Sequence, residues 1–122
     1  MGLARIMSAS SQISTVDEQR KAMVLVARRI LDGSTGIVAG ARELHSLRFP
    51  SRAETDKDIL IFVGIDSESD HLPLGEVRQH WSVKALKAKD AELQAYEARV
   101  RDRAFAACQN LIARYDHAAL QD

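Results

Sequence analysis

The chain has 122 residues, 46% hydrophobic and 28% charged, which fits one globular domain and argues against a disordered protein. Its 17 Lys and Arg residues balance 17 Asp and Glu residues, whereas a nucleic-acid-binding domain usually carries a basic excess. The single cysteine leaves no internal disulfide and no cysteine-rich zinc site. No run approaches the ~20 apolar residues of a membrane helix, and the N-terminus lacks a signal-peptide pattern. We therefore expect a cytoplasmic protein that contacts no membrane and needs no cofactor.

The first predicted elements are an N-terminal arm and a helix. Residues 1–14 are rich in serine and small side chains and have no hydrophobic period, which predicts a flexible arm. Thr15 and Glu18 have the spacing of a capping box, so we expect the first helix to begin near Thr15. Gly33 follows the last apolar residue of the pattern and fits the C-terminal end of this helix. The predicted organisation is an arm over 1–14, a single domain over 15–117 and a tail over 118–122.

A second helix is predicted from Ser34 or Thr35 to the residue before Pro50, because a proline drives its predecessor out of helical geometry. Residues 50–58 are polar and carry charges of both signs, which predicts a solvated connection. Three basic side chains recur on one face of the second helix: Arg42, His45 and Arg48. We interpret this face as solvated. The alternatives are an anion-binding patch of these three side chains and a nucleic-acid-binding surface formed by Arg42, Arg48 and Arg52.

The apolar run Ile59–Ile65 is compatible with a buried strand and with a helix. Its β-branched residues favour a strand. Thr55 and Asp58 have a capping spacing directly before it, however, and the chain has no second run with which a lone strand could pair. We therefore predict a helix, with an α+β fold and a strand over 59–65 as the alternative.

The C-terminal half is predicted to hold a short helix and a long one. Residues 66–73 form a polar turn, a short helix covers about 74–81, and Ser82 caps a helix that ends near Tyr115. At about 1.5 Å per residue the last helix is roughly 50 Å long. A domain of this size is only roughly 35 Å wide, so we expect a break near 87–90 or a second copy that covers the overhang. The predicted fold class is all-α, with four to five helices and a long C-terminal helix.

The densest polar cluster is the acidic turn of residues 66–71. The carboxylates of Asp66, Glu68 and Asp70 are spaced like the first ligands of a calcium loop. The pattern then fails, because His71 stands where the loop needs glycine and its terminal glutamate is missing. We interpret the turn as side chains that cap the flanking helices, and we predict no metal site. An enzyme or ligand-binding domain that uses this turn is the alternative.

Trp81, the only tryptophan, is predicted to lie in the core. Together with Arg78 it would also suit a binding surface, because Trp and Arg are enriched at such surfaces. Cys108 falls on the apolar side of the long helix without an adjacent base, so we expect a buried small hydrophobe and no nucleophile. No catalytic residue is predicted. The candidate binding residues are Asp66, Glu68, Asp70, His71, Arg78 and Trp81.

Two stretches carry a resemblance to a known family. They are ARRILDGSTGIVAGARELHSLR (27–48) and, more sharply, FVGIDSESDHLPLGEVRQHW (62–81). Over about residues 28–115 the chain resembles small bacterial proteins of an uncharacterised domain family whose function is unknown. The resemblance implies a compact helical protein from a bacterium and assigns no catalytic residues.

Small size, balanced charge and the overlong helix predict a non-catalytic interaction protein. We expect it to bind a protein partner or a second copy, as a homodimer, through residues 66–81 and the overhanging long helix. A bacterial immunity-type or accessory protein is one such form. The acidic turn as an enzyme or ligand site is the alternative, and a nucleic-acid binder is a weaker one.

Overall fold

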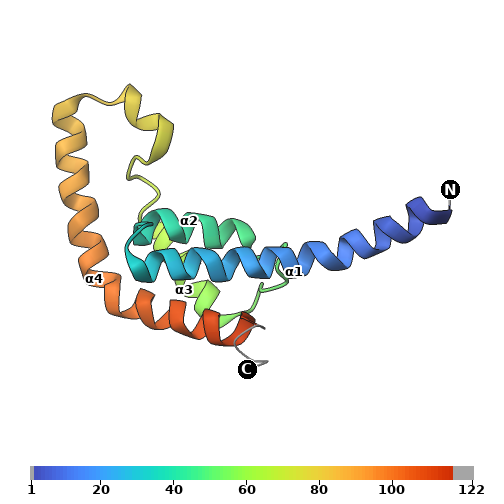
Figure 1. Ribbon diagram of the computed structural model, residues 1–122. Helices are drawn as coiled ribbons and strands as arrows, with labels where there is room; N and C mark the ends of the chain where they lie inside the picture. Colours follow the sequence, from blue (N-terminus) through green and yellow to red (C-terminus); the bar gives the residue numbers. More distant parts are fainter. Residues whose placement is uncertain (1, 117–122) are drawn as a thin grey trace.

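The computed structural model describes residues 2–116 and is all-α, as the sequence predicts (Figure 1). Residues 59–65 are helical, and residues 2–116 contain no strand, so the α+β alternative is wrong. No helix among these residues has the length and apolar character needed to cross a membrane. The elements in chain order are α1 (Gly2–Asp32), α2 (Ile37–Leu47), α3 (Lys57–Glu68), the 3-10 helix η1 (Gly75–His80) and α4 (Val83–Tyr115).

Helix α1 begins at Gly2, so the prediction that the first helix begins near Thr15 is wrong. Thr15 lies inside the helix, and its capping spacing with Glu18 does not mark a helix start. Serine lowers helix propensity only slightly, and no proline interrupts the segment, so the helix extends through it. Figure 1 shows the N-terminal half of α1 projecting away from the other helices. Gly33, at φ 84°, ends the helix as predicted, and the tail 118–122 lies outside the described residues.

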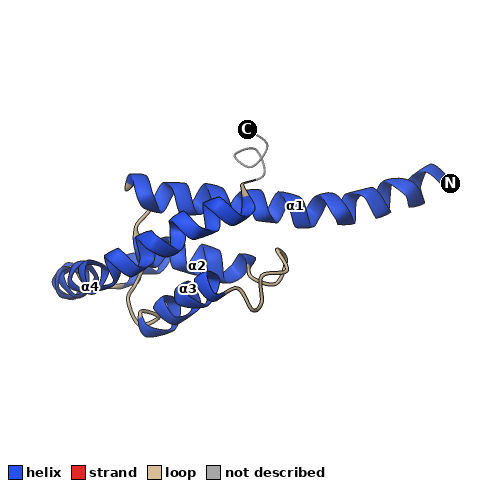
Figure 2. Ribbon diagram, turned by 90° about the horizontal axis from the view of Figure 1, so that it is seen from below, coloured by secondary structure: helices blue, strands red, loops and turns tan. Residues whose placement is uncertain are grey.

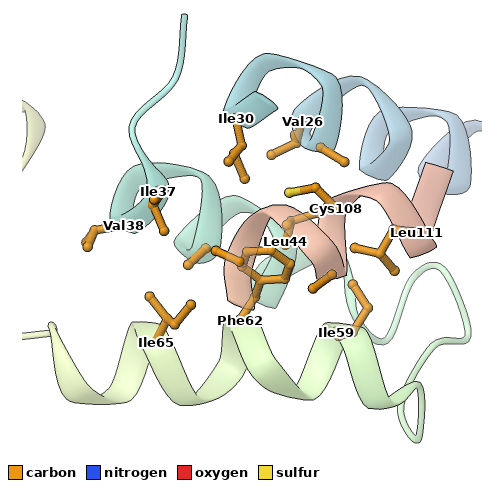
Figure 3. Packing of buried hydrophobic residues seen from close by; sticks show 14 of the residues in the cluster. Val26, Ile30, Ile37, Val38, Leu44, Ile59, Phe62, Ile65, Cys108 and Leu111 are labelled. Atoms are coloured by element: carbon orange, nitrogen blue, oxygen red, sulfur yellow. The ribbon is translucent and has the colours of Figure 1, made fainter. Parts of the chain in front are cut away.

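The core lies between α1, α2, α3 and the second half of α4 (Figure 3). Met23, Leu44 and Phe62 are fully buried there, one from each of the first three helices. Cys108 of α4 is also fully buried among them, as predicted. Gly40 of α2 lets the helices approach closely, because a Cβ at this position would stand 2.4 Å from Cδ1 of Ile30 in α1.

The connection between α2 and α3 is less solvated than predicted, since Ser51 and Ala53 are buried. Arg20 of α1 donates from Nε to the Ser51 carbonyl at 3.0 Å, and Arg48 donates to the Glu54 carbonyl at 2.7 Å. These arginines satisfy backbone oxygens that burial removes from water. Arg48 is therefore a structural group and not part of an exposed basic face.

Helices α2 and α3 differ from their predicted bounds at both ends, and α2 ends at Leu47 instead of at the residue before Pro50. Helix α2 begins after Gly36 and not at Ser34 or Thr35. Asp56 caps α3, accepting from the N–H of Asp58 at 2.9 Å, so the predicted capping pair of Thr55 and Asp58 is displaced. Helix α3 then continues to Glu68, which places the first three residues of the predicted turn 66–73 in the helix.

Helix α4 is continuous from Val83 to Tyr115, and Ser82 caps it as predicted, accepting from the N–H of Ala85 at 3.1 Å. The helix does not break near 87–90. Figure 1 shows instead that it bends sharply between its two halves. Every buried residue of α4 lies in the second half: Tyr96, Val100, Ala104, Ala107, Cys108 and Leu111. The first half leaves the core, and the turn and η1 lie beside it in Figure 1.

Candidate functional site

The six candidate binding residues do not gather at one point. Asp66 and Glu68 belong to the last turn of α3, whereas Asp70, His71, Arg78 and Trp81 belong to a projection that we call the arm, residues 70–95. The arm contains the turn after α3, η1 and the first half of α4. In Figure 2 the first half of α4 is seen nearly end-on, which shows how far it turns from the second half.

Asp66 joins α3 to α2. Its carboxylate lies 2.8 Å from Nδ1 of His45 and 3.5 Å from Nε of Arg42. Arg42 also donates to the carbonyl oxygens of Ser69 and Leu72, at 2.9 and 2.8 Å, where α3 ends. Cationic groups stabilise such exposed carbonyls. This cluster therefore fastens the C-terminal end of α3 to α2. Arg42, His45 and Arg48 each contact other parts of the protein, so they do not form the anion-binding patch that was the alternative interpretation.

The base of the arm is held by two further contacts. Glu68 accepts a hydrogen bond from the Tyr96 hydroxyl at 3.3 Å, and His71 Nε2 lies 2.7 Å from Glu92 Oε1. The contact with His71 lowers the pKa of the Glu92 carboxyl. Asp70 is exposed and has no ion pair with any side chain from residue 15 to residue 116. These side chains connect the turn to α4 and do not converge on one ligand position.

Arg78 and Asp90 form an ion pair with two hydrogen bonds within the arm. The guanidinium donates from Nη1 and Nη2 to the two carboxylate oxygens, at 2.8 and 2.9 Å. Such a two-bond pair fixes geometry as well as charge. It lowers the pKa of Asp90 and raises that of Arg78. The pair fastens η1 to the first half of α4.

The tip of the arm exposes apolar side chains. Val77, Trp81 and Val83 are 53%, 38% and 86% exposed, so the prediction that Trp81 lies in the core is wrong. The helical spacing that suggested burial belongs to a short 3-10 helix, none of whose residues is buried. The first half of α4 extends away from the core, and Trp81 lies next to its far end, so the indole does not reach the core. The exposure of Trp81 is compatible with the alternative interpretation of the sequence, in which Trp81 and Arg78 belong to a binding surface.

Sequence reasoning missed a second cluster, at the N-terminus of α3. Arg114 donates to Asp56 at 2.6 Å and to Asp58 at 2.9 Å, and the two carboxylates are only 5% and 4% exposed. Tyr115 adds a hydroxyl at 2.7 Å from Asp56. Partial burial by itself would raise the pKa of Asp56, but the hydrogen bonds from Tyr115, Arg114 and two backbone N–H groups outweigh it and lower that pKa. The partners are more than 50 residues apart, so no local spacing reveals them.

A surface pocket of about 350 Å³ lies where the start of α2 meets the middle of α4. Glu97 reaches into this region and accepts from the N–H of Val38 at 2.9 Å, which stabilises a helix start that Gly36 cannot cap. None of the six candidate residues lines the pocket. Its walls come from Ile30, Gly33, Thr35, Gly36, Ile37, Gln94, Glu97, Ala98, Arg101 and Phe105.

Two observations concern a metal site and a cysteine nucleophile. No group of three or more His, Cys, Asp or Glu side chains within residues 2–116 is arranged to hold a metal ion. Burial raises the pKa of the Cys108 thiol to about 12, which disfavours the thiolate that a nucleophile requires.

No family model, curated protein or solved structure matches the chain. The resemblance of residues 27–48 and 62–81 to small bacterial proteins therefore stays a prediction. The arm, with its exposed apolar tip, is the candidate functional site on geometric grounds.

Proposed function

We propose that the protein is a non-catalytic interaction protein that binds a protein partner, or a second copy of itself, through the arm. The observation that carries the proposal is the exposure of Val77, Trp81 and Val83 at the tip of a projection. Exposed apolar side chains that gather in one place favour a protein partner that removes them from water. A cytoplasmic role in a bacterium, as an immunity-type or accessory protein, is part of this proposal.

Contacts within the protein make the acidic turn a less favoured alternative. Asp66 contacts His45 and Arg42, and Glu68 accepts from Tyr96, so these carboxylates support the fold. An enzyme or ligand site would need several such groups directed at one bound molecule. We propose no catalytic residue, cofactor or metal for this turn.

Matched variants of the full chain test the proposal. The arm variant is Trp81→Ala with Val83→Ser, and the control is Phe49→Ser, because Phe49 is 61% exposed and lies outside the arm. Tagged proteins would be recovered from the native host, and the molar mass of each would be measured by light scattering after size exclusion. We expect the wild type and the control to share a partner or a dimer mass that the arm variant loses. Equal behaviour of all three proteins would refute the proposal.

A further inference from the structure

The pocket beside the start of α2 has one side chain of each charge in its walls. They are Glu97 and Arg101 of α4, and no other charged side chain of residues 15–116 lines this pocket. The apolar walls come from Ile30, Ile37, Ala98 and Phe105. The charges of the lining sum to zero, but a negative and a positive group are both present beside an apolar surface.

Glu97 and Arg101 do not neutralise each other. They are four residues apart on one helix, with the glutamate first, which is the spacing and order that favours an ion pair. Each contacts another group instead. Oε2 of Glu97 accepts from the N–H of Val38 at 2.9 Å, and the guanidinium of Arg101 lies over the Phe105 ring, 5.1 Å from its centroid.

Both charged groups keep hydrogen-bonding capacity that the fold does not use. Oε1 of Glu97 accepts no hydrogen bond from residues 15–116, and the N–H groups of Arg101 donate none to them. An acceptor with negative charge and a donor with positive charge are therefore available to a molecule in the pocket.

We propose that this pocket binds a free amino acid with an apolar side chain. Such a molecule carries an ammonium and a carboxylate on one carbon, and these complement Oε1 of Glu97 and the guanidinium of Arg101. Its side chain contacts the apolar walls, which removes both surfaces from water. A molecule with only one charge leaves the other charged group of the pocket without a partner, so a simple acid or amine fits less well.

The size and place of the pocket agree with a small ligand. Its volume of about 350 Å³ is near the lower end of the range for small-molecule sites, which favours a single amino acid over a peptide. The inference goes beyond the proposed function and does not depend on it, because none of Val77, Trp81 and Val83 lines the pocket.

A nuclear magnetic resonance titration of the full-length protein tests the ligand class. The probes are L-leucine and L-phenylalanine, and we expect at least one to shift the amide signals of the pocket residues with a dissociation constant below about 10 mM. The N-acetyl derivative of that probe lacks the ammonium, and its amide lacks the carboxylate. Each should bind at least about threefold more weakly. Glycine, which lacks the apolar side chain, should bind at least about tenfold more weakly.

Two variants assign the two charges. Glu97→Gln keeps an acceptor for the N–H of Val38 but loses the carboxylate, so it should weaken the amino acid at least about threefold and leave the N-acetyl derivative unchanged. Arg101→Gln should weaken the amino acid to the same extent and leave the amide unchanged. The controls, Asp102→Asn and Arg103→Gln, make the same charge changes at exposed positions of α4 outside the pocket and should bind like the wild type.

Three results would overturn the proposal. They are a wild type that binds neither probe below about 10 mM, derivatives that bind as well as the amino acid, and controls that lose as much affinity as the pocket variants. The arm variant, Trp81→Ala with Val83→Ser, should bind the amino acid like the wild type. Loss of a protein partner and loss of this ligand are therefore separate outcomes, and each proposal can fail without the other.

Discussion

The body and the arm of this protein are stabilised by different interactions. In the body, formed by residues 15–69 and 96–116, side chains such as Met23, Leu44 and Phe62 are completely buried. In the arm, η1 and the first half of α4 contain no buried residue and are held by ion pairs such as Arg78 with Asp90. Burial contributes more to stability than exposed ion pairs do. The arm should therefore open locally at a lower free energy than the body unfolds.

The two halves of α4 show this difference within one helix. The second half packs against α1 and α3, whereas the first half has one side exposed along its length. The contrast is the physical basis for assigning binding to the arm and stability to the body.

The largest expected effect is on the body, from Phe62→Ala. Phe62 is fully buried at the centre of the core, so its truncation removes apolar contacts and leaves a cavity. We expect the free energy of unfolding to fall by about 3–5 kcal/mol. Chemical denaturation followed by circular dichroism would measure it. A loss below about 1 kcal/mol would contradict the packing described for the body.

Arg114→Ala is expected to have the next largest effect. It leaves Asp56 and Asp58, both nearly buried, without their cation, although Arg114 itself is 39% exposed. A loss of about 1–3 kcal/mol in the free energy of unfolding is expected. Arg114→Lys, the matched control, keeps the charge but not both hydrogen bonds and should fall between the variant and the wild type.

The same cluster predicts a pH dependence. The pKa of Asp56 is lowered in the folded protein, so the stability it contributes is complete above its unfolded pKa and is lost as pH falls through the folded value. Stability from this group should thus be constant from pH 7 to about 5 and decline below about pH 4. Asp56→Asn should lower stability at pH 7 and flatten the decline below pH 4. Denaturation midpoints across this range would test both expectations.

The helices could be predicted from sequence more fully than their surroundings. The capping serine at position 82 and the uninterrupted helical pattern after it are local signals, and both are confirmed. The helix over residues 59–65 is confirmed as well. It was predicted because the sequence has no second run with which a strand could pair. The predicted start of α1 was wrong because the capping spacing of Thr15 and Glu18 also occurs inside helices.

The candidate site was predicted only in part. The sequence places Arg78 and Trp81 in one short segment, but it does not show that α4 bends and carries this segment away from the core. Exposure of Trp81 depends on that tertiary arrangement and not on local spacing. The polar side chains of residues 66–71 were identified as a group, yet the partners of Asp66, Glu68 and His71, which are His45, Tyr96 and Glu92, lie 21 or more residues away.

A smaller effect is expected from Asp90→Asn in the arm. The substitution removes the charge that Arg78 contacts through two hydrogen bonds, but both side chains are more than a third exposed. Global stability should fall by less than about 1 kcal/mol. Amide hydrogen exchange in η1 should nevertheless become faster, while exchange in α2 and α3 stays unchanged. Equal acceleration in arm and body would show that the two regions unfold as one unit.

The smallest effect on stability is expected from Val83→Ser, for which α4 itself supplies the matched control. Val83 is 86% exposed and Val100, on the same helix, is 6% exposed. The same substitution should leave the unfolding free energy within about 0.5 kcal/mol at Val83 and lower it by about 2 kcal/mol or more at Val100. Measurements on dilute protein, where no second copy is bound, keep folding separate from association. If Val83→Ser destabilises the dilute protein as strongly as Val100→Ser, the tip of the arm is part of the core's packing, and its exposure cannot be the basis of binding.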